Sequence, residues 1–166
     1  MKERYSVRDY RKGDFEAINE LWQDIGLGGR QRGDDEKVVE ATLAAGGRFL
    51  ILTEEPAGRI VGTSWITHDS RRSYLHHFGI AKFHQGRGLS KMLMDASFRV
   101  FEQLGFQVKL EVHHDNSIAI DLYGKSGFEY LGDYDVYIIR DLQAVITQQG
   151  GSSASARGKG PESHNR

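Results

Sequence analysis

Polar and apolar residues alternate at the start of the chain and then repeat with helical spacing. Tyr5, Val7 and Asp9 alternate with two polar neighbours, which predicts a short strand of the kind found at a sheet edge. Asp14 stands where the N-cap of a helix is expected, and Gly26 is expected to end that helix. The apolar face predicted for this helix consists of Phe15, Ile18, Leu21, Trp22 and Ile25.

A glycine-rich stretch from Gly26 to Gly33 follows, and it predicts an irregular loop. A second helix is expected from Asp34 or Asp35 to about Ala45. Loops that join two helices often shape the entry of a substrate, so this loop is a candidate part of a binding site. The residues of the second helix that are expected to turn inward are Val38, Val39 and Leu43.

Three β-rich segments come next, at residues 48–54, 60–68 and 74–81. A Pro-Ala-Gly turn joins the first two segments, and a polar turn at residues 69–73 joins the second to the third. The pattern therefore predicts three consecutive antiparallel strands.

A longer amphipathic helix is predicted from about Leu89 to Gly105, because its apolar residues recur three and four positions apart. Residues 106–112 predict a further strand, residues 117–125 a short helix, and residues 128–139 a last strand interrupted near Gly132. The long helix stands between two predicted strands, and this order favours parallel neighbours. The expected fold class is therefore α/β, with a central sheet of mixed direction.

The composition supports a single folded domain. The chain has 166 residues, of which 39% are hydrophobic, so it can build a core and is neither disordered nor collagen-like. Residues 148–166 contain no Val, Ile, Leu, Met, Phe, Tyr or Trp. They predict a disordered tail behind a domain at residues 1–147.

Charge and composition also limit the partners. A net charge of -1 gives no general attraction to nucleic acid or to an anionic membrane, so an anionic ligand needs a local site. No apolar run reaches the ~18 residues of a membrane span, and the first residues lack the apolar stretch of a signal peptide, so a cytoplasmic protein is expected. With no cysteine in the chain, a catalytic thiol is excluded. The oligomeric state is not determined, and a homodimer stays open.

The sequence Gln-Gly-Arg-Gly-Leu-Ser at residues 85–90 links the third strand to the long helix. Glycines let a ligand approach the backbone closely, and the first N–H groups of a helix lack internal partners and favour negative charge. The sequence has neither the lysine of a P-loop nor the third glycine of a dinucleotide motif. It predicts an anion site of another type, and the alternative is a tight turn that uses glycine only for its geometry.

Two segments carry a resemblance to a known family. FGIAKFHQGRGLS at residues 78–90 and LEVHHDNSIAIDLYGKSGF at residues 110–128 resemble the two signature motifs of the GNAT superfamily of N-acetyltransferases. In the first motif Gln85 and Gly88 match, and Ser90 stands where the family has glycine or alanine. The second motif is matched by Asn116, Tyr123, Gly127 and Phe128. The predicted order of elements fits this family from residue 5 to about residue 140.

The resemblance implies a mostly antiparallel sheet, flanked by about four helices, whose two central strands splay apart and admit acetyl-CoA. The backbone of Phe78, Gly79 and Ile80 would pair with the pantetheine arm and polarise the thioester carbonyl. Asn116 would hydrogen-bond the cofactor near its amide arm. The residues expected to hold the pyrophosphate are Gln85, Gly86, Arg87, Gly88, Leu89 and Ser90, with Arg87 as an added cation.

Tyr123 is implied as the general acid that protonates the departing CoA thiolate. A phenol has a reference pKa of ~10, so it is still protonated at neutral pH and can donate. The alternative is a helix tyrosine that only packs beside Leu122 and Phe128.

A base is also needed, because an alkyl ammonium with a reference pKa of ~10.4 cannot attack a carbonyl. The segment around Glu111 looks like ribosomal-protein alanine N-acetyltransferases, which implies Glu111 as that base. Alternatively, Glu111 lies on a polar strand face, since polar and apolar residues alternate there. A proton relay through His76, His77 or His113 is a further alternative.

No metal site is expected from the histidines. His76–His77 and His113–His114 are adjacent pairs on or near strands, where neighbours point to opposite faces, so neither pair alone would chelate an ion.

Together, these patterns predict an enzyme that moves acetyl from acetyl-CoA to a primary amine by direct attack in a ternary complex. The alternatives are a catalytically silent acyl-CoA-binding regulatory module and an anion-binding domain without CoA. The sequence does not identify the acceptor, which could be a small molecule or a peptide.

Overall fold

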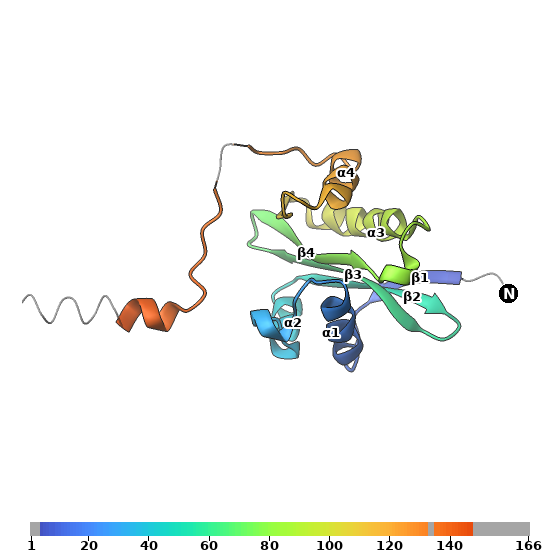
Figure 1. Cartoon of the computed structure of the whole chain (residues 1–166), viewed down its shortest axis with the longest axis horizontal. Coiled ribbons are helices and arrows are strands. Elements are labelled where there is room, and N and C mark those ends of the chain that lie inside the picture. Colours follow the sequence, from blue (N-terminus) through green and yellow to red (C-terminus); the bar gives the residue numbers. More distant parts are fainter. Residues whose placement is uncertain (1–3, 133–134, 148–166) are drawn as a thin grey trace, which may run out of the picture. The chain divides into compact units, whose positions relative to one another are not determined.

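The computed structural model describes residues 4–132 and 135–147 (Figure 1). The chain divides into two compact units, one that ends at Phe128 and one that begins at Glu129. The tail expected at residues 148–166 lies outside the described residues. None of the described helices is both long enough and apolar enough to cross a membrane.

The first unit is built on a five-stranded sheet whose strands follow one another in chain order. The first four strands are antiparallel neighbours, and the last pair is parallel. This confirms the predicted hairpins and the crossover through the long helix. The strands are β1 (Arg4–Asp9), β2 (Arg48–Glu55), β3 (Arg59–His68), β4 (Arg72–Ile80) and β5 (Gln107–Leu110).

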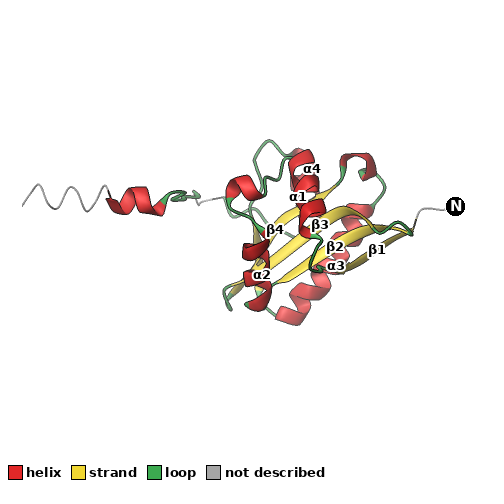
Figure 2. Cartoon of the chain, turned by 90° about the horizontal axis from the view of Figure 1, so that it is seen from below, coloured by secondary structure: helices red, strands yellow, loops and turns green. Residues whose placement is uncertain are grey.

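Helices cover both faces of the sheet. Figure 1 shows α1 and α2 on one side and α3 and α4 on the other, and Figure 2 shows α1 and α2 in front of the strands when the molecule is seen from below. Two short 3-10 helices, η1 and η2, lie in the connections that follow α1 and β4. The helices are α1 (Phe15–Asp24), η1 (Arg30–Arg32), α2 (Glu36–Ala44), η2 (Lys82–His84), α3 (Leu89–Leu104) and α4 (Ser117–Lys125).

Each face of the sheet has its own core. The uninterrupted apolar run in β2 supplies both cores, because successive side chains of a strand point to opposite faces. Phe49 and Ile51 are buried against α1 and α2, whereas Leu50 and Leu52 are buried against α3. Two tryptophans, Trp22 and Trp65, stack 6.0 Å apart on the α1 side.

The helix boundaries agree with the predictions, but one capping detail differs. Asp14 occupies the N-cap position of α1, yet its side chain accepts hydrogen bonds from Arg8 and from the backbone of Arg11 and makes no cap bond. Asp35, rather than Asp34, caps α2 by accepting from the backbone of Val38. Val38 itself is 38% exposed, so its predicted inward position is wrong.

The strand predicted at residues 128–139 is wrong for the described residues of that range, which form no strand. A strand is stable only when its backbone groups are paired, and the second unit offers no partner strand in its described part. Its apolar side chains, such as those of Tyr137 and Ile138, are exposed. Residues 142–147 form a short helical segment.

Candidate active site at the split between two strands

β4 pairs with the parallel strand β5 over only part of its own length. The ladder runs from the pair Arg72 and Gln107 to the pair Leu75 and Leu110. β4 then continues to Ile80, and among the described residues no strand pairs with its second half on that side. The pairing therefore stops at Leu75, where β5 itself ends as the last strand of the described sheet, and this leaves a stretch of β4 backbone open to an extended ligand.

A bulge in β4 lies within this open stretch. Thr63 of β3 pairs with Gly79 and Trp65 pairs with His76, so His77 and Phe78 together face a single residue of β3. His77 has a positive φ of 44°. Thr63 Oγ1 donates to the carbonyl oxygen of His77 at 2.7 Å, and it accepts from Trp22 Nε1 at 3.0 Å. These two bonds hold the bulge in place from inside the core.

The three residues expected to pair with the pantetheine follow the bulge. Phe78 and Ile80 belong to the core on the α3 side, whereas Gly79 faces the connection after α1. A Cβ on Gly79 would lie 2.6 Å from Ile25 Cδ1 and 3.0 Å from Leu27 Cδ1. Glycine therefore permits the close approach of that connection to β4.

The glycine turn that precedes α3 combines left-handed glycines with backbone N–H groups that make no hydrogen bond to described residues. Gly86 and Gly88 have φ angles of 74° and 76°, which side chains other than glycine rarely adopt. Among the hydrogen bonds of the described residues, none uses the backbone N–H of Gly86, Gly88, Leu89 or Ser90. A Cβ at either glycine would meet nothing within 4 Å, so the space beside these donors is open.

Two polar side chains of the turn are engaged with the protein. Gln85 Nε2 donates to the carbonyl oxygen of Ile80 at 2.9 Å, which ties the turn to the end of β4. Arg87 donates to the hydroxyl of Tyr5 at 3.2 Å. The structure thus shows Gln85 as a brace for the turn, a role that its place in the motif did not reveal.

Asn116 acts as the cap of α4. Its Oδ1 accepts from the backbone N–H of Ala119 at 3.1 Å, and its own N–H donates to His113 at 2.9 Å. The side chain thereby fixes the start of the helix that carries Tyr123.

Tyr123 lies on α4 and packs against the sheet. Its ring centroid is 6.2 Å from that of Phe78 and 5.7 Å from that of Phe128. Burial raises the pKa of Tyr123 to about 12. The hydroxyl is therefore protonated at neutral pH, and it makes no hydrogen bond to any described residue.

Glu111 follows directly after β5, where the ladder with β4 has ended. Its side chain is 64% exposed and lies 3.7 Å from Lys109 Nζ. Its charge acts on His76 and opposes the lowering of the pKa of that histidine by burial. Glu111 and His76 therefore lie next to each other just beyond the point where the pairing of β4 and β5 ends.

The two histidines of β4 do not alternate between faces, so that expectation is wrong for His76–His77. The bulge turns both rings toward the same tryptophan, and Trp65 lies 6.0 Å from His76 and 5.5 Å from His77. His77 also lies 3.3 Å from Asp34, a neighbour that no pattern along the chain predicts. A one-residue bulge leaves no clear trace in the pattern of residue types.

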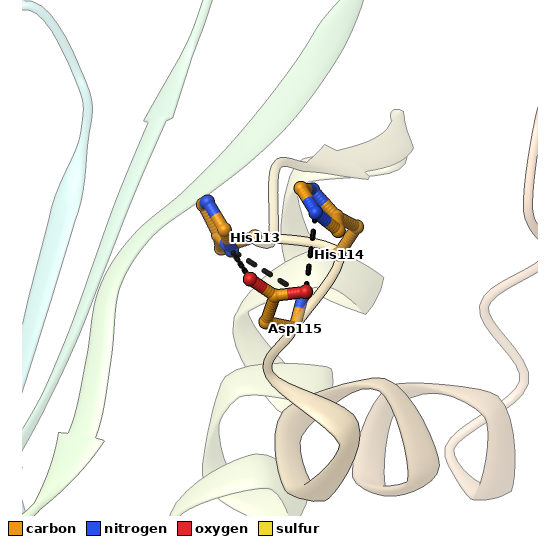
Figure 3. Close-up of side chains that lie close together, drawn as sticks. All are labelled: His113, His114 and Asp115. Carbon is orange, nitrogen blue, oxygen red and sulfur yellow. Dashed lines mark hydrogen bonds and ion pairs between the residues drawn. The ribbon is translucent and has the colours of Figure 1, made fainter.

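His113 and His114 lie in the loop between β5 and α4, together with Asp115 (Figure 3). Within the described part of the chain, these three side chains are the one group whose donor atoms could hold a metal ion, since the atoms lie within 4.8 Å of one another. All three are exposed, and Asp115 already pairs with both rings at 3.6 and 3.1 Å. The two rings stack 4.5 Å apart, so the expectation that they point to opposite faces is wrong here as well, because these residues lie in a loop and not on a strand.

Comparison with known proteins agrees with this architecture. The sequence matches the Acetyltransferase (GNAT) family over residues 15–128. An acetyltransferase from Pectobacterium atrosepticum is 30% identical over 124 residues, which are 74% of this chain and 86% of the relative.

Two solved structures have the same fold. The ribosomal-protein-S18-alanine N-acetyltransferase of Escherichia coli has a TM-score of 0.64 at 20% identity, over 76% of this chain and 78% of that chain. An aminoglycoside N-acetyltransferase in complex with CoA has a TM-score of 0.69 at 17% identity, over 85% of this chain and 98% of that chain. The family match covers both the open stretch of β4 and the glycine turn, and the protein belongs to the GNAT family of acetyltransferases.

Proposed function

We propose that the protein transfers an acetyl group from acetyl-CoA to a primary amine by direct attack within a ternary complex. One observation carries this proposal: the second half of β4, which pairs with no described strand on that side, ends beside a turn in which the backbone N–H groups of Gly86, Gly88, Leu89 and Ser90 donate to no described residue. An extended arm that carries a pyrophosphate at its far end fits this combination. Acyl transfer is the activity of the family, and acetyl-CoA and the amine are the specific proposal.

The turn supplies donors and space for the anionic end of the cosubstrate. The backbone N–H groups of Gly86, Gly88 and Ser90 would bind the pyrophosphate at the start of α3, where the helix dipole favours negative charge. The backbone of Phe78, Gly79 and Ile80 would hold the pantetheine arm and place the thioester near the bulge. Acetyl-CoA itself supplies the activated acetyl group.

Side chains near the open stretch of β4 would donate and accept the protons that the reaction moves. The amine nitrogen forms a bond to the carbonyl carbon, the carbon–sulfur bond breaks, and the thiolate takes a proton from Tyr123. The proton lost by the amine goes to Glu111, directly or through water. Burial raises the pKa of Tyr123 to about 12, so the phenol holds its proton at neutral pH until the departing thiolate, a strong base close by, takes it.

Thermal unfolding with acetyl-CoA, CoA and ATP, followed by a thiol-release assay on a panel of amines, tests the proposal. A ligand at ~100 times its dissociation constant adds about 2.7 kcal/mol to the stability of the folded state. We expect stabilisation by acetyl-CoA and CoA but not by ATP, and thiol release with at least one amine. Stabilisation without thiol release would indicate a silent acyl-CoA-binding module, and no stabilisation would contradict the cofactor assignment.

Replacement of Glu111 with glutamine is expected to lower turnover most at low pH. Free amine is scarce there, so the loss of a base is felt more strongly than at pH values near the pKa of the acceptor. The measurement is kcat/KM for the acceptor between pH 6 and 9. Asp95→Asn serves as a matched control, because Asp95 is an exposed carboxylate of α3 paired with Lys91. An unchanged pH profile in Glu111→Gln would return Glu111 to a purely structural role.

A further inference from the structure

The connection between α1 and α2 crosses the open stretch of β4 on the face opposite α3. At one point Ile25 and Leu27 pack on Gly79, and at another Asp34 meets His77. The ring of Tyr123 and the start of α3 belong to the other face, where Phe78 also packs. The proposed cosubstrate contacts and this connection therefore lie on opposite sides of the same strand segment.

His77 is an unusual residue at this crossing. Its ring lies 4.1 Å from Trp22, and both ring nitrogens are buried without a hydrogen bond. Nε2 is nevertheless 3.3 Å from Asp34 Oδ2, and the two side chains are only 13% and 24% exposed. A buried polar group without a full hydrogen bond is costly and is rarely retained without a role.

Burial, aided by nearby positive groups, keeps the imidazole of His77 neutral. Burial lowers the pKa of His77 to about 4, with further lowering by His76 and Arg32. Burial also raises the pKa of Asp34, while Arg32 acts against that rise. Trp22 of α1 and Trp65 of β3 complete the surroundings and carry no charge. A neutral imidazole can present an N–H group to the Asp34 carboxylate.

We infer that Asp34 and His77 are positioning residues that hold residues 26–34 against the bulge of β4 and so set the wall past which the amine acceptor enters. The inference rests on the proposed function, because it assigns the acceptor to the face of β4 that the cosubstrate contacts leave open. Four glycines of this connection have positive φ angles, and the backbone hydrogen bonds of its described residues stay within the connection or reach α1, so none of them holds it to β4. The contact between Asp34 and His77 holds the last residue of the connection against β4.

Hydrogen exchange measured by mass spectrometry on the full chain, without any ligand, tests the inference. The reporters are the backbone N–H groups of Arg32, Gly33 and Asp34, which donate to carbonyls within the same connection. We expect Asp34→Ala and His77→Phe to speed exchange at residues 27–34 about tenfold, with no change in the β2–β3 hairpin. His77→Phe keeps a ring against Trp22 but removes the N–H donor.

Two further variants sharpen the result. His77→Asn is expected to exchange within about threefold of the wild type, because asparagine tolerates a positive φ and retains an N–H donor. Glu20→Gln, which alters a carboxylate on α1 away from the contact, should leave exchange unchanged. The double variant Asp34→Ala with His77→Phe should exchange no faster than the worse single variant, since both remove one contact.

Unchanged exchange at residues 27–34 in Asp34→Ala would overturn the inference, and that variant decides alone if His77→Phe fails to fold. The exchange result needs neither acetyl-CoA nor an amine, so it is independent of whether the proposed function holds. With an acceptor from the amine panel, Asp34→Ala should raise the KM for the acceptor about tenfold and leave the KM for acetyl-CoA unchanged. An equal rise in both KM values would also overturn the positioning role.

Discussion

Gly88→Asp is expected to raise the dissociation constant for CoA by about 100-fold or more. It should destabilise the folded protein no more than an uncharged side chain at the same position does. Gly88 is the N-cap of α3, and its N–H belongs to the donors assigned to the pyrophosphate. A carboxylate there adds negative charge next to an anion, and two like charges about 4 Å apart repel by several kcal/mol near a protein surface. The same carboxylate interacts favourably with the helix dipole, so binding and stability should respond differently.

Gly88→Asn is the matched control for this prediction. Asparagine has the size of aspartate and the same tolerance of a φ near 76°, but it carries no charge. We expect its dissociation constant for CoA, measured by isothermal titration calorimetry, to rise only about fivefold, which corresponds to about 1 kcal/mol. Equal weakening in the two variants would show that shape, and not charge, decides binding at this turn. Unchanged binding in Gly88→Asp would remove the turn from the cofactor site.

Much of the sheet follows from local patterns that the sequence displays. The run Phe49 to Leu52 is apolar because both faces of β2 are covered, and α3 begins and ends at Leu89 and Leu104 as its spacing predicts. The parallel pair follows from the helix that separates its strands. These features depend on neighbours in the chain, which is why periodicity can predict them.

Features that depend on residues far apart in the sequence could not be predicted from local patterns. The bulge of β4 is held by Thr63 and Trp22, neither of which is close to His77 in the sequence. The alternation at residues 128–139 satisfies the pattern of a strand, but a pattern does not supply the partner that a strand requires.

In the candidate site, too, the features set by local residue types could be predicted and those set by tertiary contacts could not. The glycines of the turn were recognisable because a positive φ restricts the residue type, and Gly86 and Gly88 both have one. The bracing of that turn by Gln85 and the contact of Asp34 with His77 arise from tertiary packing. The assignments of Tyr123 as acid and Glu111 as base stay predictions that kinetics must test.

Tyr123→Phe is expected to lower kcat between about 100-fold and 10,000-fold, the usual range for removal of a general acid. Phenylalanine keeps the ring that packs against Phe78 and Phe128, so α4 and the sheet should remain as they are. The variant lacks only the hydroxyl, whose proton is retained through neutral pH because burial raises the pKa of Tyr123 to about 12. The dissociation constant for acetyl-CoA should therefore stay within about twofold of the wild-type value.

Steady-state turnover and acetyl-CoA affinity, measured on the same preparations, distinguish this role from simple packing. Tyr130→Phe is the matched control, because Tyr130 is 95% exposed and loses the same hydroxyl. Its turnover should equal that of the wild type. If Tyr123→Phe also turned over at the wild-type rate, Tyr123 would be a packing residue, and the proton that the thiolate needs would have to come from water. If kcat fell and acetyl-CoA affinity fell with it, the hydroxyl would contribute to binding, and the separation of roles between the glycine turn and α4 would be wrong.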